Sequence, residues 1–196
     1  MERFKIRKGE LKDTLDFSNL VMQASGNFLL HLFGEDTQNL IQFLYKNPAN
    51  VFSIDHTFVA EVNERCGGIL LAYDYKTKKT EELNTGRLIT KKLRVRFFKI
   101  FIRLIKAGNM SKIYKDDFYI SDIAVYHELR GLGCATALIK EAEKIARAKK
   151  MRLSLDVESD NSNAIKLYRK VGFETTEEKV IKLGEEFRFL RMTKNT

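Results

Sequence analysis

The sequence predicts a mixed α/β fold with a strand–helix–strand unit in its second half. Strand-like and helix-like segments alternate along the 196 residues, without repeats or low-complexity tracts. The hydrophobic content of 44% allows a chain of this length to bury one sizeable core. Charged residues make up 31%, but they are interspersed with apolar periodic segments, and there is only one proline. Extended disorder is therefore not expected.

The first half of the chain predicts a strand, two helices and a hairpin. Apolar residues recur at helical spacing after the first strand, and Asp36 or Thr37 is placed to cap the second helix before Asn47 and Pro48 end it. Two apolar runs joined by a glycine-containing turn are typical of a hairpin. The predicted strand is 4–8, the helices are 11–23 and 36–45, and the hairpin consists of 56–62, the turn 63–68, and 69–75.

The second half predicts a strand–helix–strand unit followed by a helix and two strands. The run 117–125 is rich in β-branched and aromatic residues, and the segment 133–148 has apolar residues at helical spacing. The run 152–157 returns to a strand pattern, and 161–173 predicts a short helix that ends near Gly172. The segments VIKL and FRFLRM predict a closing pair of strands.

The segment 76–115 departs from this alternation. Within it, residues 86–109 are long enough for a helix of about 20 residues, or roughly 30 Å. Its basic residues predict one narrow charged stripe on a mainly apolar helix, and the apolar surface predicts packing against a substrate site or a second subunit. A helix packed on the domain with this edge in solvent, a membrane-surface helix, a subunit contact and a lid remain alternatives. The stripe consists of Lys92, Arg96, Lys99, Arg103 and Lys106.

Charge and cysteine content bear on partners and compartment. The net charge of +9 favours an anionic ligand, nucleic acid or an acidic membrane surface, without choosing among them. Cys66 and Cys134 match no zinc or redox spacing, so we expect a reducing compartment, the cytoplasm. No secretory signal or membrane span is expected. The histidines His31, His56 and His127 show no metal-ligand spacing, and His127 is predicted to lie in a loop.

Residues 128–139, ELRGLGCATALI, predict an anion site. A strand that ends at Val125, a short turn and a helix that begins near Gly133 direct unpaired backbone N–H groups and the positive end of the helix to one place. Glycine lets an anion approach the backbone closely, because no Cβ occupies that space. The alternative is a tight strand-to-helix turn that merely tolerates glycine.

Two motifs in order give the chain a family resemblance. The first is R-x-x-G-x-A, and the second is N-x-x-A-x-x-L-Y-x-x-x-G-F. With IAV at 123–125 before the turn, the chain resembles the GNAT superfamily of acetyl-coenzyme A-dependent N-acetyltransferases. The resemblance covers 117–173, is looser towards the N-terminus and fails at 76–115. The motif residues are Arg130, Gly133 and Ala135, then Asn161, Ala164, Leu167, Tyr168, Gly172 and Phe173.

The resemblance implies one GNAT domain over 1–196, with 76–115 as a helical insertion. It implies a mostly antiparallel sheet in which the parallel strands 117–125 and 152–157 splay apart to admit the pantetheine arm. It further implies that the pyrophosphate rests on backbone amides of the turn. Asn161 would hydrogen-bond the cofactor or act as an ordinary helix cap. The implied coenzyme A-binding residues are Ile123, Ala124, Val125, Arg130, Gly131, Leu132, Gly133, Cys134, Ala135, Thr136, Asn161 and Tyr168.

The resemblance also implies roles in catalysis. Tyr168 matches the family's tyrosine, which protonates the departing thiolate; its alternative is a core tyrosine. Backbone N–H groups near Val125 are the expected donors to the developing oxyanion. An attacking amine must lose a proton, and Asp156 is the candidate base, with Asp122 and Glu158 as alternatives. Cys134 is expected to be a small filler rather than a nucleophile.

Two functions of different classes follow. One is an enzyme that moves an acetyl group from acetyl-coenzyme A to a primary amine in a ternary complex; a protein N-terminus, a lysine, a polyamine or a small amine are all open as acceptors. The other is a non-catalytic basic module on the same scaffold that binds RNA or an acidic membrane. The enzyme is preferred, as a monomer or homodimer without nucleic acid, metal or membrane partners, and its donor coenzyme A is itself anionic.

Overall fold

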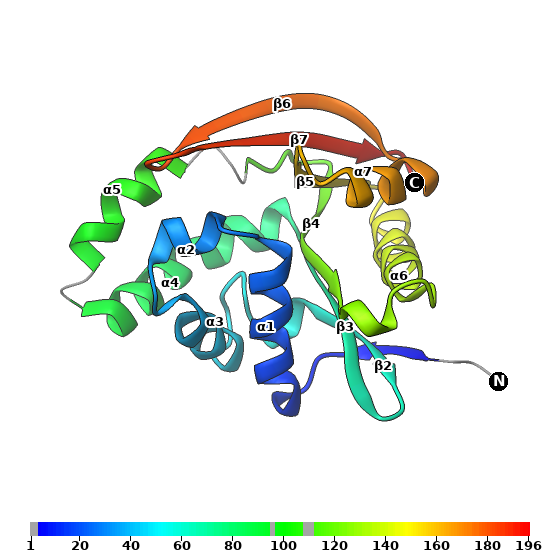
Figure 1. Cartoon of the computed structure of the whole chain (residues 1–196), viewed down its shortest axis with the longest axis horizontal. Coiled ribbons are helices and arrows are strands. Elements are labelled where there is room, and N and C mark those ends of the chain that lie inside the picture. The colour runs from blue at the N-terminus through cyan, green and yellow to red at the C-terminus, as the bar shows by residue number, and fades with distance from the viewer. Residues whose placement is uncertain (1–3, 95–96, 108–111) are drawn as a thin grey trace.

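The computed structural model describes residues 4–94, 97–107 and 112–196, and its centre is a seven-stranded sheet (Figure 1). The strand order is β1-β2-β3-β4-β5-β7-β6. All neighbours pair antiparallel except β4 and β5, which are parallel. The predicted mixed, mostly antiparallel sheet is therefore confirmed. The strands are β1 Lys5–Lys8, β2 Thr57–Val62, β3 Arg65–Asp74, β4 Asp117–Val125, β5 Arg152–Glu158, β6 Glu174–Lys182 and β7 Glu186–Lys194.

Helices cover both faces of the sheet (Figure 1). One apolar core cluster joins the sheet to α1–α5, and a second cluster joins it to α6 and α7. Within the described residues, the connections also contain the short 3-10 segments η1 Leu11–Asp13, η2 Ile54–His56 and η4 His127–Leu129. The helices are α1 Thr14–Ala24, α2 Phe28–Phe33, α3 Thr37–Lys46, α4 Tyr75–Leu93, α5 Phe97–Ala107, α6 Cys134–Ala148 and α7 Ser162–Lys170.

The parallel strands β4 and β5 separate part of the way along their length. They pair only between residues 117–120 of β4 and 152–155 of β5. Beyond this point β4 continues to Val125 and β5 to Glu158 without pairing to each other. A register irregularity between β3 and β4 skips Ser121, where the divergence begins. The splayed strands that the resemblance implied are therefore present.

The β2–β3 hairpin has a shorter turn than the predicted 63–68. Asn63 and Glu64 alone form the turn, and both have positive φ. Gly67 and Gly68 lie inside β3, where a Cβ at Gly68 would sit 2.9 Å from the Ala124 carbonyl oxygen on β4. These glycines therefore permit close packing of the strands and are not turn residues. A local sequence pattern does not distinguish a glycine of this kind from a turn glycine.

The segment 76–115, which the resemblance implied to be an insertion and which is called the insertion below, contains two helices rather than the single helix predicted over 86–109. α4 begins eleven residues earlier, at Tyr75, because the Asp74 carboxylate caps it by accepting from the Thr77 N–H at 2.8 Å. It ends where Arg94 takes a φ of +48°. The helices pack on α2, α3 and β6. Of the predicted basic stripe, Arg96 and the side chains of Lys99 and Lys106 lie outside the described residues.

Helix α2 was not predicted from the sequence. It is only six residues long and follows Gly26, and its FLLHLF run is too short to show a helical period. Phe28 packs edge-on against Phe187 and Phe189 of β7, with ring centroids 5.3 and 5.4 Å apart. Contacts with a strand about 160 residues away therefore place this helix.

Candidate active site

A cavity of about 940 Å³ occupies the space where β4 and β5 diverge. Its lining includes residues of both core clusters, so it reaches both faces of the sheet. On one face it meets α6 and α7, and on the other it meets α1, α2, α4 and α5. Every residue in the predicted site lines this cavity except Leu132, which packs against the second core cluster.

The turn between β4 and α6 presents free backbone donors to the cavity. Gly131 and Gly133 have φ of +79° and +89°, and a Cβ at either would meet no atom within 4 Å. The first intrahelical bond of α6 runs from the Ala137 N–H to the Gly133 carbonyl. The N–H groups of the helix's first three residues, 134–136, therefore have no intrahelical acceptor. Arg130 is exposed beside them. This arrangement fits a phosphate group.

The open edge of β4 offers further backbone groups. The Tyr126 N–H donates to the Gly67 carbonyl of β3 at 3.0 Å, so strand alternation turns the N–H and carbonyl of Val125 to the opposite edge. There the Gln23 amide donates to the Val125 carbonyl at 3.1 Å. No strand covers this edge between Ser121 and Val125 in the part of the chain that the structure describes. An extended arm could pair along Ile123–Val125 as an added strand.

Tyr168 of α7 is 7% exposed and lines the cavity. Its ring packs against Phe173, with centroids 5.8 Å apart. Its hydroxyl makes no hydrogen bond with any residue that the structure describes. Burial, with a smaller contribution from the Asp122 carboxylate, raises the pKa of Tyr168 well above its usual range. The phenol is therefore protonated at neutral pH and able to donate.

Asn161 and Cys134 have structural contacts of their own. The Asn161 side chain caps α7 by accepting from the Ala164 N–H at 3.2 Å, which matches the helix-cap alternative, and it also lines the cavity. Cys134 is 2% exposed and belongs to the second core cluster. Burial raises the pKa of its thiol, which disfavours the nucleophilic thiolate. The geometry matches the small filler that the sequence suggested.

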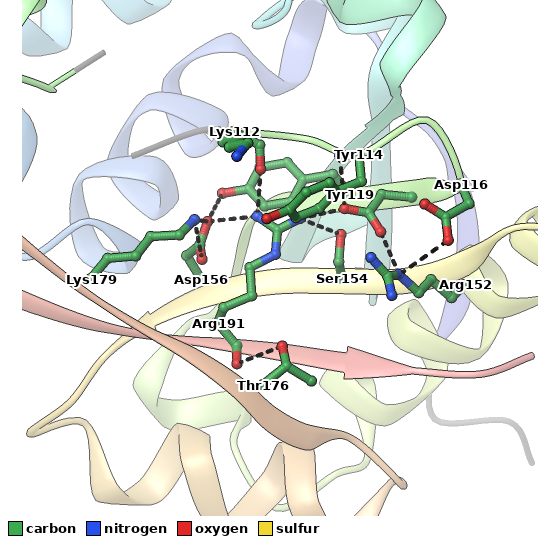
Figure 2. Close-up of polar contacts among 11 residues, drawn as sticks. Lys112, Tyr114, Asp116, Tyr119, Arg152, Ser154, Asp156, Thr176, Lys179 and Arg191 are labelled. Atoms are coloured by element: carbon green, nitrogen blue, oxygen red, sulfur yellow. Dashed lines mark hydrogen bonds and ion pairs between the residues drawn. The ribbon is translucent and has the colours of Figure 1, made fainter. Parts of the chain in front are cut away.

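Asp156 lies within a buried ionic network rather than free in the cavity (Figure 2). Its carboxylate accepts from Lys179 at 3.0 and 3.2 Å and from Arg191 at 3.2 Å. The Tyr119 hydroxyl donates to it at 3.1 Å. Because two cations and a phenol already occupy its oxygens, this carboxylate is poorly placed to accept a proton from an amine. The partners lie 23 and 35 residues further along the chain, out of reach of a local motif.

Arg191 of β7 is the centre of the network and is 1% exposed (Figure 2). Its guanidinium donates to the Lys112 carbonyl at 2.7 Å, to the Ser154 hydroxyl at 3.2 Å and to both Asp156 and Asp117. Asp117 also accepts from the Arg152 Nε at 2.7 Å. The network thus ties β4, β5 and β7 together beside the point where β4 and β5 separate.

Asp122 is the carboxylate with the more suitable surroundings. It lies on β4 directly after the skipped residue Ser121, whose hydroxyl donates to it at 2.8 Å. No described lysine, arginine or histidine forms an ion pair with it. Burial, opposed by the Ser121 hydrogen bond, raises the pKa of Asp122 to about 6. From the sequence, Asp122 was only an alternative to Asp156 as the base, because the burial of its carboxyl depends on the splayed strands.

The remaining titratable groups differ in their relation to the cavity. Glu158 lines the cavity, and burial raises the pKa of its carboxyl. His31 and His56 pair with glutamates at 3.1 and 2.7 Å, and His127 lies in η4. Among residues 4–94, 97–107 and 112–196, no cluster of three or more His, Cys, Asp or Glu could hold a metal. Within the same ranges, no helix has the length and apolar character needed to span a bilayer.

Comparisons with known proteins agree with this fold. The model of the acetyltransferase (GNAT) family matches residues 100–173. A crystal structure of an N-acetyltransferase from Staphylococcus aureus Mu50 superposes with a TM-score of 0.69 at 23% identity, covering 96% of this chain and 99% of its own. Another acetyltransferase crystal structure gives 0.70 at 20%, covering 97% and 98%. No curated protein matches by sequence.

A more distant structure points the same way. The ribosomal-protein-alanine N-acetyltransferase from Brucella melitensis superposes with a TM-score of 0.60 at 19% identity, covering 98% of this chain and 99% of its own. At these identities the superpositions show a shared fold. The family match over residues 100–173 and the superpositions agree with the resemblance: the chain has the fold of GNAT acetyltransferases.

Proposed function

We propose that the protein is an N-acetyltransferase that transfers an acetyl group from acetyl-coenzyme A directly to a primary amine. One observation supports this most: a single cavity joins the glycine turn on one face of the sheet to a pocket on the other face, through the gap between β4 and β5. A donor held at the turn and an acceptor from the opposite side would meet in this gap. Direct transfer needs no covalent intermediate on the protein.

The donor half fits coenzyme A. The backbone N–H groups between Gly131 and Thr136 would hold the pyrophosphate, with Arg130 beside them, and the open edge of β4 would hold the pantetheine arm. Neither glycine has a neighbour within 4 Å of the Cβ position, so the turn is open to a ligand. The bound donor supplies an activated thioester. The protein contributes binding, orientation and proton transfer.

Three groups of the chain would act at the reacting atoms. The Val125 N–H, which faces the open edge, would donate to the carbonyl oxygen as it gains negative charge. The Tyr168 phenol would give its proton to the departing sulfur. Asp122 would take the proton from the attacking amine, since a base whose pKa is about 6 is ionised at neutral pH and still accepts protons. Asp156 would instead hold the strands in place.

We also propose that the protein is located in the cytoplasm. Cys66 and Cys134 are both free and buried in separate core clusters, as expected for a protein that folds in a reducing compartment such as the cytoplasm.

The proposal is tested first by binding. Saturating acetyl-coenzyme A at about 100 times its Kd adds about 2.7 kcal/mol to the stability of the folded state. For a chain of this size that raises the melting temperature by about 5–10 °C. An unchanged melting temperature would reject the proposal and favour the non-catalytic binding module. Salt-sensitive binding to RNA would then support that alternative.

Tyr168→Phe tests the chemistry. The variant keeps the ring that packs on Phe173 and removes a hydroxyl that has no partner among the described residues, so folding and donor binding should persist. We expect kcat, measured by thiol release, to fall by about 10²–10⁴-fold. Full activity in this variant would remove the assigned acid.

A further inference from the structure

The cavity has a second half on the α1–α5 face of the sheet, and its walls are mainly apolar. Helix α2 contributes Phe28, Leu32 and Phe33, and the insertion contributes Ile89 and Leu104. Phe189 of β7 closes another side. The proposed donor site does not require this apolar space, because the glycine turn that would hold the phosphate groups lies on the other face.

The insertion turns one face of α4 towards this space. Four residues that line it, Lys78, Glu82, Gly86 and Ile89, recur at spacings of four, four and three residues, so they share one side of the helix. Gly86 lies in the middle of α4, where glycine is less favourable for the helix than alanine. A Cβ there would meet no protein atom within 4 Å. The glycine therefore leaves the cavity wider than any other residue would.

Few carboxylates of this half can pair with a cationic acceptor. Asp122, where the two halves meet, and Glu158 are the lining carboxylates without a described ion-pair partner. Asp156 is occupied by Lys179 and Arg191, and Glu82 lies 3.9 Å from Lys78. An acceptor with several positive charges would therefore find only Asp122 and Glu158 without a cation, among mainly apolar walls.

We propose that this half-cavity binds the acceptor, and that the acceptor is a primary amine carrying one bulky apolar group, aromatic or branched aliphatic. The proposal rests on the N-acetyltransferase function and names its substrate class. The apolar group lies among α2, α4, α5 and β7, and the amine reaches Asp122. The nitrogen forms a bond to the acetyl carbon, the carbon–sulfur bond breaks, Asp122 accepts the proton lost by nitrogen, and the thiol gains one from Tyr168.

The test compares amines by thiol release from acetyl-coenzyme A. The probes are 2-phenylethylamine and 3-methylbutylamine against spermidine and an alanine-terminated tetrapeptide, each with the full-length protein. We expect kcat/KM for 2-phenylethylamine to exceed that for spermidine by about 10-fold or more, as burial of an apolar group in a fitted pocket provides. Spermidine or the tetrapeptide as the better substrate would overturn the proposed class and leave the acetyltransferase function in place.

Gly86→Leu tests the location. The side chain would fill the apolar half, so kcat/KM for 2-phenylethylamine should fall by about 10-fold or more. The rise in melting temperature caused by acetyl-coenzyme A should be unchanged, and the variant should be at least as stable as the parent because leucine favours helix. Gly86→Ala controls for the helical preference, and Thr80→Leu adds the same bulk at an exposed position of α4.

The outcomes separate the two proposals. Equal activity of Gly86→Leu and the parent towards 2-phenylethylamine would place the acceptor elsewhere. Failure of 2-phenylethylamine to react, while acetyl-coenzyme A still raises the melting temperature, would overturn the acceptor class alone. Failure of acetyl-coenzyme A to bind would overturn the proposed function together with this inference.

Discussion

Replacing Arg191 by leucine should destabilise the fold more than any change to an exposed charge. The guanidinium is 1% exposed and donates to groups on β4, β5 and the segment before β4. Leucine would leave Asp117 and Asp156 buried with one fewer cation (Figure 2). Breaking a buried ion pair from one side costs about 3–5 kcal/mol.

The expected loss lies at the lower end of that range. Asp117 would keep Arg152 at 2.7 Å, and Asp156 would keep Lys179 at 3.0 Å, so neither carboxylate would be left without a cation. A loss of about 3 kcal/mol lowers the melting temperature of a chain of this length by about 6–12 °C.

The free energy of unfolding is best measured by urea denaturation, followed by far-UV circular dichroism. Arg188→Leu is the matched control: it lies on the same strand, its side chain is 66% exposed, and it pairs with Glu186 at 2.7 Å. Such an exposed pair contributes about 0–1 kcal/mol. If Arg191→Leu and Arg188→Leu lost equal stability, the network would not be what holds the splayed strands.

Three further changes test the site. Asp122→Asn should lower kcat by about 10²–10⁴-fold. In the parent, activity should fall as the pH drops through about 6, because the base becomes protonated, and the variant should lack this fall. If the pH–rate profile of the variant kept the acidic limb, the base would be another group. Gly133→Val should weaken the binding of acetyl-coenzyme A, measured by calorimetry. A φ of +89° costs a β-branched residue about 1–2 kcal/mol, and the valine side chain would enter the proposed phosphate site. An unchanged affinity would count against that site. Cys134→Ala should leave kcat within about twofold of the parent, because a buried, protonated thiol is inert, and a large loss would reopen a nucleophilic role.

Features set by nearby residues were predictable. The glycines of the turn after β4 and the helical spacing of apolar residues in 133–148 lie close together in sequence, so the turn and α6 could be predicted. A strand, a turn and a helix in sequence fix where the helix N-terminus lies, whereas Asp156, Asn161 and Tyr168, which also line the cavity, were predicted from the family resemblance.

Features set by distant residues were not predictable in this way. From the sequence Gly67 and Gly68 were predicted to lie in a turn, but in the structure they lie in β3, and Gly68 packs closely against β4. From the sequence Asp156 is a candidate base, but in the folded chain Lys179 of β6 and Arg191 of β7 pair with its carboxylate. The burial on which the proposal of Asp122 as the base depends also arises from the gap between the strands.

The sequence by itself determined the class of fold and the position of the glycine turn, because backbone dihedrals, helix caps and side-chain periodicity act over a few residues. The tertiary structure decided which carboxylates have cations beside them and which residues line the apolar half of the cavity. Burial and Coulomb interactions depend on distance in space, and in this chain those distances are set by the strands β6 and β7 and by the insertion helices α4 and α5.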